Sequence, residues 1–268
     1  MWWIKVACHV AKLYTGTQGK NSLYYHDSSL ANGAGDNSYR YAGASDSVNN
    51  YICLGSAATT CPDANLFRII GVFGAQTKVI RAKSVGTKQW HSSQVNTWSS
   101  SSLNTYLNGE YLTSLGTLKN KIATTTWKVG GGSYANIETS VPKTAYKNEV
   151  GSNASSTTYE AKIGLMYVSD YYYSASPSAW TLVGWNESDA TKDYRFSKGE
   201  NWLYGGGWDW TISRISGNSN GAFEVYIGGC VFNDNVSDGY GVRPSFSLFS
   251  STTYVSGSGS MSDPIRIN

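Results

Sequence analysis

The chain has 268 residues, of which 15% are charged, and its formal net charge is +3. This length allows one or two domains with a sizeable buried core. Lys and Arg form no cluster larger than a pair such as Lys119 and Lys121, so we expect no nucleic acid or other polyanion as partner.

The chain contains 20 Tyr, 10 Trp and 29 Gly but only 5 Pro. This composition is typical of an exposed, loop-rich protein with much β structure. It also matches antibody-like binding surfaces, where rigid rings supply contact area at low entropic cost. The longest apolar runs, such as residues 67–73, have the length of a strand, so no transmembrane segment is expected in this chain.

The first segment, MWWIKVACHVAKLY, predicts an amphipathic helix that packs on the rest of the protein. It is too short and too charged for a signal peptide, so either a leader has been removed or another export route is used. Together with the Gly- and Ser-rich loops up to residue 50 it forms a predicted N-terminal extension, and residues 51–268 form the main domain. The residues that share the helical face are Trp2, Trp3, Val6, Val10 and Leu13.

The four cysteines separate into two cases. Cys53 and Cys61 flank a short loop and could close a disulfide ring worth about 2–3 kcal/mol, which would imply an oxidising, extracytoplasmic setting. Cys8 and Cys230 lie far apart in the sequence, and whether they pair stays open. No Cys-x-x-Cys or Cys/His array is present, so a structural zinc site is not expected.

The middle of the chain predicts regular elements. Residues 65–73 and 77–85 indicate two strands joined by a Gly-Ala-Gln turn. The segment from 98 to 115 predicts an amphipathic helix with Ser at its N-cap. Residues 161–176 indicate a buried strand that leads into a turn or short helix. The apolar residues at helical spacing in the second segment are Leu103, Tyr106, Leu107, Tyr111 and Leu112.

The last quarter of the chain combines a regular apolar frame with an unpatterned set of side chains. No pair in that set has the character of an acid, base or nucleophile, so the segment predicts binding rather than catalysis. The frame consists of Trp202, Trp210, Ile212, Phe223, Val225, Val231, Val236, Val242, Pro244 and Phe246. The residues between are Asp209, Arg214, Glu224, Tyr226, Gly228, Cys230, Phe232, Asp234, Asn235 and Asp238.

Within this quarter the segment EVYIGGCVF alternates like a strand. It would place Val225, Ile227, Gly229 and Val231 on the core side. The solvent side would then present an apolar patch, which usually marks an interaction site. The residues on that side would be Tyr226, Gly228, Cys230 and Phe232. We also expect Trp202 and Trp210 in the core, while the position of Trp208, beside three glycines, stays open.

The chain lacks the sequence motifs of several classes of enzyme and cofactor-binding protein. The three His residues have no ligand spacing, and no nucleophile elbow, phosphate-binding loop or dinucleotide fingerprint is present. A pair of glycosidase carboxylates stays open as an alternative, with Glu187, Asp189, Asp209 and Glu224 as candidates. No cofactor is expected. The oxygen-rich segments 185–189 and 233–239 leave calcium as a minor alternative to solvated turns, because neither follows the EF-hand order.

Separate stretches of the chain resemble a widespread family of bacterial secreted or surface domains. They are LYYHDSS, YICLGS with CPDANLFRIIGVF, the run Trp98–Leu107–Asn108–Gly109, IGLMYVSDYYYS, WTIS, and GVRPSFSL with GSGSMSDPIRI. That family is related to the C-type-lectin-like and formylglycine-generating-enzyme-like fold, where a Gly-Gly-x-Trp stretch and a terminal Gly-Phe-Arg-type strand bracket the ligand region. GGGW at 205–208 and GVRP at 241–244 resemble those brackets. The resemblance implies an α+β, loop-rich domain with mixed short antiparallel sheets and one or two helices.

Several members of this fold are variable proteins of diversity-generating retroelements, whose C-terminal surface codons are mutagenised. The unpatterned residues between the frame positions would suit such a surface, and Arg214 stands where a Pro after WTIS would be expected. The enzyme branches do not carry over, because the chain lacks their active-site cysteine pair and their His cluster.

The sequence therefore predicts a non-enzymatic, extracellular or cell-surface protein of a bacterium or phage that binds a protein or glycan through residues 202–246. The alternatives are a pilin-like or cell-envelope component, and a carbohydrate-binding module or glycan hydrolase. The expected ligand-contacting residues are Tyr204, Trp208, Asp209, Arg214, Glu224, Tyr226, Gly228, Cys230, Phe232, Asn233, Asp234, Asn235, Asp238 and Tyr240.

Overall fold

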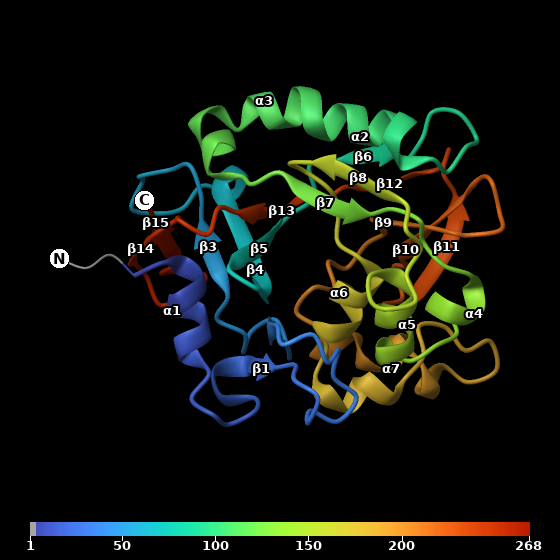
Figure 1. The fold of residues 1–268 in the computed structure, drawn as a ribbon, viewed down its shortest axis with the longest axis horizontal. Coiled ribbons are helices and arrows are strands. Elements are labelled where there is room, and N and C mark those ends of the chain that lie inside the picture. The colour runs from blue at the N-terminus through green and yellow to red at the C-terminus, as the bar shows by residue number, and fades with distance from the viewer. Residues whose placement is uncertain (1–3) are drawn as a thin grey trace.

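The computed structural model describes residues 4–268 as a mixed α+β structure whose strands form three sheets (Figure 1). The expected α+β class is confirmed. Among the described residues the α-helices outnumber the one or two expected, but none is longer than eight residues. They are α1 (Val6–Leu13), α2 (Ser102–Tyr106), α3 (Leu112–Ser114), α4 (Tyr134–Ile137), α5 (Pro142–Glu149), α6 (Val168–Tyr173) and α7 (Tyr194–Ser197).

The largest sheet combines strands from both ends of the chain. Its main strand order is β1-β2-β4-β3-β15-β14, and β5 joins β4 to β13. Because β2 pairs with β4, the predicted extension of residues 1–50 is continuous with this sheet. The strands are β1 (Leu23–Tyr25), β2 (Tyr39–Tyr41), β3 (Tyr51–Cys53), β4 (Leu66–Phe73), β5 (Gln76–Arg81), β13 (Ser245–Leu248), β14 (Tyr254–Ser256) and β15 (Ile265–Ile267).

The centre of this sheet is the predicted hairpin of β4 and β5. Seven of the eight residues of β4 are buried, as expected for a strand covered on both faces. Helix α1 packs against β4 and β5, so the predicted N-terminal helix is confirmed from Val6 onward. Val6 and Val10 are buried, whereas Trp2 and Trp3 lie outside the described residues.

The C-terminal end of the chain returns to the beginning of the sheet. β15 runs parallel to β3, and the backbone amide of Val6 donates to the carbonyl of Thr252, so α1 lies beside the last strands (Figure 1). The predicted disulfide between Cys53 and Cys61 is present and closes the loop that follows β3. Cys8 and Cys230 do not pair, since Cys8 is exposed and Cys230 is buried.

The predicted helix of residues 98–115 is confirmed, although it is not uniform. The hydroxyl of Ser101 accepts a hydrogen bond from the backbone amide of Asn104 at 3.0 Å, which caps α2. One π-helical turn at Leu107–Tyr111 then leads into α3. Leu103, Leu107 and Tyr111 are buried, so the predicted apolar face packs on the core.

Residues 163–166 are buried as expected, but the segment 161–167 does not form the predicted strand. A single bridge joins Gly164 to Ser245, and the chain then enters helix α6. Every residue of α6 is buried. The small third sheet pairs β7 (Thr125–Lys128) with β8 (Thr158–Ala161) beside this segment.

The second sheet contains most of the last quarter of the chain. Its order is β11-β10-β9-β12-β6, so β9 is central and β10 lies between β9 and the edge strand β11. It packs against α6 through β9 and β10. Trp202 and Trp210 are buried, as predicted. The strands are β6 (Thr87–Gln89), β9 (Asp209–Arg214), β10 (Gly221–Val225), β11 (Val231–Asn235) and β12 (Gly239–Gly241).

Candidate ligand-binding face

One face of the second sheet gathers Glu224 and two aromatic residues. Glu224 on β10 lies directly opposite Trp210 on β9 and Phe232 on β11. Directly opposite residues in an antiparallel pair project to the same side of the sheet. Phe223 and Val225 alternate with Glu224 and project to the opposite side, where they belong to the hydrophobic core.

Tyr240 extends across this face and covers it. Its hydroxyl donates to a carboxylate oxygen of Asp234 on β11, although β9 and β10 lie between β12 and β11. The Tyr240 ring packs on Trp210 with centroids 4.6 Å apart and lies nearly parallel to Trp208 at 6.0 Å. Glu224, on the intervening strand, is therefore enclosed beneath this ring.

The rings continue from Trp208 along the edge of the face. Trp208 meets Tyr226 edge-on with centroids 5.6 Å apart, and Tyr226 lies 6.4 Å from Phe232. Trp208 is 38% exposed and Tyr226 is 37% exposed, while Phe232 and Tyr240 are half-buried. We call the surface formed by Trp208, Tyr226, Phe232, Asp234 and Tyr240, with Glu224 beneath it, the C-terminal face.

The Glu224 carboxyl group is the least satisfied polar group of this face. The residue is 0% exposed, and neither carboxyl oxygen has a hydrogen-bond partner. Burial raises the pKa of Glu224 to about 8, and the neighbouring carboxylates, first among them Asp234, act in the same direction. An unpaired buried charge is costly, so the fold favours the protonated form.

Asp234, Asp238 and Glu138 lie near enough to Glu224 to raise its pKa, and none of the three has a basic partner among residues 4–268. Burial and the adjacent Asp234 raise the pKa of Asp238. Burial also raises the pKa of Glu138, which accepts a 2.5 Å hydrogen bond from the Asn233 amide. Within residues 4–268, no ion pair involves Glu138, Glu224, Asp234 or Asp238.

A cavity of about 490 Å³ adjoins the C-terminal face at Trp208 and Tyr240. The GGGW loop and the GVRP segment both line it, and the Gly241 amide donates to the Trp208 carbonyl at 2.9 Å. The two stretches predicted to bracket the ligand region thus lie side by side. The buried pair of Asp209 and Arg243, 3.7 Å apart, also lines this cavity. Burial raises the pKa of Asp209 in spite of the Arg243 charge.

The predicted single strand EVYIGGCVF is wrong, because residues 226–230 form the turn between β10 and β11. Because of this turn, Ile227 and Cys230 lie on the opposite sides from those that strand alternation predicts. Ile227 is 42% exposed, whereas Cys230 is 0% exposed. Burial raises the pKa of the Cys230 thiol to about 12, so this residue is not the exposed contact that alternation predicted.

Two tyrosines and a glycine fix this turn. The Tyr171 hydroxyl donates to the Gly229 carbonyl at 2.6 Å, and the Tyr204 hydroxyl donates to the Ile227 carbonyl. Gly229 has φ +93°, and a Cβ atom there would lie 2.5 Å from the Lys198 Cβ. The turn therefore holds Tyr226 in a defined position at the edge of the C-terminal face.

Several residues predicted to contact the ligand are buried or form hydrogen bonds within the protein. Asp209 is 5% exposed and Glu224 is 0% exposed, so their prediction as exposed contacts is also wrong. The Arg214 guanidinium donates to the Gly130 carbonyl at 3.2 Å, away from the rings. The Asn235 side chain accepts from the Ser237 amide and stabilises the following turn. Gly228 is half-buried beside Tyr226.

The structure adds Trp185, which was not predicted as a site residue. Its ring lies 5.4 Å from Phe232 and extends the row of rings. The Arg195 guanidinium lies 4.0 Å above Trp185 and is paired with the buried Asp193 at 2.6 Å. In the sequence, the 185–189 segment stands out only for its oxygen atoms, and no periodicity relates Trp185 to Phe232.

The first oxygen-rich segment forms a turn, whereas the second begins in strand β11 and ends in the turn that follows it. In the first, Asn186 accepts from the backbone amides of Ser188 and Asp189 at 3.0 Å. In the second, Asp234 accepts from the Asn235 amide at 2.8 Å. Over residues 4–268, no three His, Cys, Asp or Glu side chains converge as a metal site would require.

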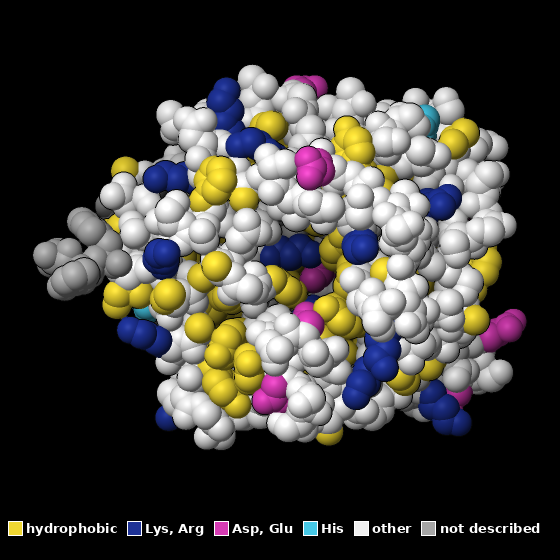
Figure 2. Space-filling model, in the orientation of Figure 1, with side chains coloured by type: hydrophobic (Ala, Val, Ile, Leu, Met, Phe, Trp, Pro, Cys, Tyr) yellow, Lys and Arg dark blue, Asp and Glu magenta, His cyan; other side chains and the backbone are white. Residues whose placement is uncertain are grey.

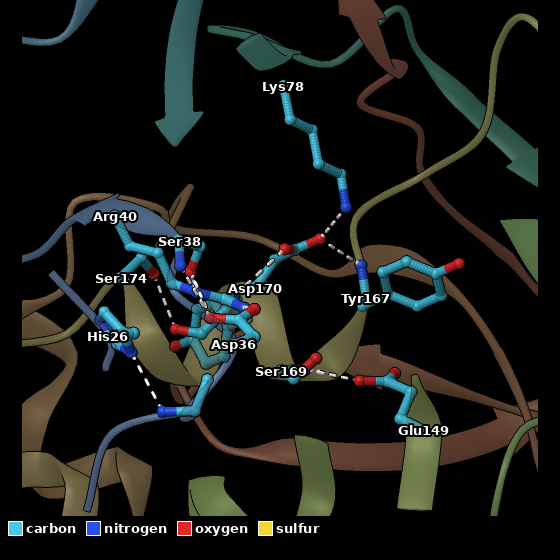
Figure 3. Close-up of polar contacts among 12 residues, drawn as sticks. His26, Asp36, Ser38, Arg40, Lys78, Glu149, Tyr167, Ser169, Asp170 and Ser174 are labelled. Carbon is cyan, nitrogen blue, oxygen red and sulfur yellow. Dashed lines mark hydrogen bonds and ion pairs between the residues drawn. The ribbon is translucent and has the colours of Figure 1, made fainter. Parts of the chain in front are cut away.

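A second charged cluster lies between the large sheet and α6. Figure 2 shows a hollow near the centre of the molecule with basic and acidic side chains at its floor, over the region where β5 and α6 face each other in Figure 1. In Figure 3 the Lys78 amine points to Asp170 at 2.5 Å. Arg40 is bound to Asp36 at 2.6 Å and lies 3.9 Å from Asp170.

This cluster positions α6. Asp170 accepts from the Tyr167 amide at 2.8 Å, and Glu149 accepts from the amides of Val168 and Ser169 at 2.8 Å, so both carboxyl groups cap the start of the helix. Burial raises the pKa of Glu149 and lowers the pKa of Lys78. Since each charge here has a partner, the cluster is suited to support rather than recognition.

The comparisons with known proteins give one family. Residues 75–250 match the family described as Domain of unknown function (DUF6273). No curated protein and no solved structure matches the chain. Within residues 4–268, the helices are too short or too polar to cross a lipid bilayer.

Proposed function

The chain belongs to the DUF6273 family, and we propose that it is a recognition protein that binds a partner, without catalysis, through the C-terminal face. The observation that carries this proposal is the row of four partly exposed rings along the second sheet, with Phe232 and Tyr240 on strands and Trp208 and Tyr226 directly beside strands. Aromatic residues dominate the binding energy of protein interfaces when they are held in place before binding.

The scaffold supports preorganisation of these rings. Tyr240 is held by Asp234, and the turn that carries Tyr226 is held by Tyr171 and Tyr204. The adjoining cavity of about 490 Å³ is large enough to take one side chain or one sugar ring of a partner. These features favour equilibrium recognition of a protein or glycan surface.

The finer assignments belong to the same proposal. The meeting of GGGW with GVRP beside the rings supports a C-type-lectin-like ligand region. The disulfide supports an extracellular or cell-surface location, because such bonds persist in oxidising compartments. Diversification by a retroelement would be established by a neighbouring reverse transcriptase gene and a near-copy of the coding sequence for residues 202–246 that differs at adenines.

The binding test compares the wild type with a variant in which Trp208, Tyr226 and Phe232 are replaced with Ala. Ligands are first selected from a glycan array and from a displayed peptide library. We expect the variant to lose binding to every selected ligand with little change in Tm. The matched control replaces the exposed Phe249 and Met261, which lie outside the C-terminal face. Retained binding would refute the proposal, and a fall in Tm of more than about 10 °C would show that the rings are structural.

One observation favours a second candidate, a glycan hydrolase. The pKa of Glu224 is raised, as is typical of a general acid in retaining or inverting glycosidases. A turnover assay on each glycan that binds distinguishes the two candidates. Hydrolysis that is abolished by Glu224→Gln would establish the enzyme, whereas binding without turnover supports recognition alone.

A further inference from the structure

Carboxyl groups gather on and beside the C-terminal face in a chain whose overall charge is positive. Glu138, Glu224, Asp234 and Asp238 have no basic partner within residues 4–268, although the chain carries 21 Lys and Arg against 18 Asp and Glu. Three cations near the rings already have acidic partners: Arg195 pairs with Asp193, and Arg243 and Lys83, which line the cavity beside Trp208 and Tyr240, pair with Asp209 and Asp63. Close carboxylates repel each other, so the fold holds Glu224 protonated, and a cation supplied from outside would favour its ionised form.

The burial of Glu224 is a second observation that points to a ligand at this face. Its carboxyl group is fully buried, and neither oxygen accepts or donates a hydrogen bond. Native proteins satisfy most buried polar side chains, so an orphaned carboxyl group beneath a partly exposed surface needs a functional explanation. It lies between Trp210 and Phe232 and under Tyr240, at the base of the C-terminal face.

The rings above Glu224 are the type that binds cations, and they are free to do so. Elsewhere Lys78, Lys88 and Arg40 lie over aromatic rings at 3.8–5.8 Å. Over residues 4–268, no Lys or Arg lies over Trp208, Tyr226, Phe232 or Tyr240. Trp and Tyr faces attract ammonium and guanidinium groups, most strongly where water is excluded.

Resting on the proposed function, we propose that the C-terminal face binds an organic cation, an ammonium or guanidinium group on an aliphatic stem. The stem packs against Trp208, Tyr226 and Tyr240, and the cationic head lies toward Asp234, Asp238 and Glu224. A metal ion fits less well, because the described carboxyl groups do not converge into a set of three ligands. A neutral apolar group would leave the carboxylates uncompensated.

This assignment predicts that binding releases a proton. The pKa of Glu224 is about 8, so at pH 7 the free protein holds this carboxyl group mainly protonated. A cation beside it favours the ionised form. The groups that face Glu224 are Asp209, Asp234, Asp238, Glu138, Tyr240 and Cys230. Asp209 is compensated by Arg243, and Tyr240 and Cys230 are neutral at this pH, so Glu224 is the main source of the proton.

The test uses isothermal titration calorimetry of the full chain with millimolar probes. The probes are butylammonium, the capped tripeptide acetyl-Gly-Lys-Gly-amide, its norleucine counterpart as neutral control, and calcium. We expect both amines to bind and the norleucine peptide not to bind. Between pH 6 and 7, affinity should rise about tenfold, since binding is coupled to ionisation of Glu224. The observed binding enthalpy should change with the ionisation enthalpy of the buffer, because the buffer takes up the released proton.

Variants locate the effect on this face. Glu224→Gln should abolish proton release and the pH dependence, and Trp208→Ala should weaken amine binding at least tenfold. Asp238→Asn, on the half-buried turn, should also weaken it and serves as a second variant if Glu224→Gln folds poorly. The matched control is Glu160→Gln, an exposed residue on β8, which should bind like the wild type.

The outcomes distinguish a basic side chain of a polypeptide from a free amine, and they test the cation proposal separately from the recognition function. Much tighter binding of the peptide than of butylammonium indicates a basic side chain of a polypeptide partner, and equal binding indicates a free amine. Equal binding of the norleucine peptide, no amine binding, or a response to calcium alone would overturn the organic cation. If selected partners still lose binding in the ring variant, the recognition function stands and only the cation assignment fails.

Discussion

Replacement of Glu224 with Gln should stabilise the protein at alkaline pH. The folded-state pKa is about 8, against 4.5 for the unfolded chain, so folding is favoured by protonation of this carboxyl group. Between pH 4.5 and 8 the folded protein holds a proton that the unfolded chain has lost. Stability therefore falls as pH rises through this window, and the full cost is reached above pH 8.

The magnitude follows from the two pKa values. At 1.36 kcal/mol for each pH unit, their difference corresponds to about 5 kcal/mol, and relaxation or water penetration lowers this to about 3–5 kcal/mol. Gln has nearly the same shape as protonated Glu and carries no charge. The two proteins should thus differ by less than about 1 kcal/mol at pH 5, and the variant should be more stable by about 3–5 kcal/mol at pH 9.

Urea unfolding at pH 5 and pH 9, followed by tryptophan fluorescence, measures both differences. At pH 9 the Tm of the variant should also rise by about 10 °C, given the size of the chain. Glu160→Gln on the exposed face of β8 is the control and should change neither value. A Glu224→Gln variant that is no more stable than the wild type at pH 9 would refute the assignment of an uncompensated buried carboxyl group.

Three further predictions test the supporting structure. Lys78→Met should lower the free energy of unfolding by about 3–5 kcal/mol, because it leaves Asp170 as a buried, weakly paired charge. The control is Lys83→Met in an exposed ion pair, which should lower it by less than about 1 kcal/mol. Urea titration measures both values. Iodoacetamide at pH 8 should label exposed Cys8 but not buried Cys230 in the folded protein, and mass spectrometry that finds both labelled would contradict the burial. Gly229→Ala should lower stability by about 1–3 kcal/mol by thermal denaturation, whereas an unchanged Tm would show that the positive φ is not required.

Local sequence patterns predicted the elements that depend on neighbouring residues. The β4–β5 hairpin, the Ser101 cap of α2 and the start of α1 were all readable, because periodicity and capping act within a few residues. The disulfide was also predicted from the short loop between its cysteines. The extent of β structure in the last quarter followed from the same signals.

The prediction failed at residues 226–230 for a physical reason. Alternation continues through a two-glycine turn when its flanking residues happen to be apolar, so the pattern does not separate one strand from a hairpin. As a result Cys230 was assigned to solvent and Ile227 to the core. The prediction of a strand at residues 161–167 was wrong for a related reason. A short apolar run does not reveal whether a neighbouring strand is available to pair with it.

The sequence by itself determined the class of structure, the binding-type composition and the aromatic residues from which a site could be built. Only the tertiary structure decided which of them act together, since Tyr240 reaches Asp234 across two strands and encloses Glu224. Composition and periodicity report the neighbours of a residue along the chain. Burial, charge compensation and ring contacts depend instead on neighbours across the sheet, and these are fixed by strand order and register.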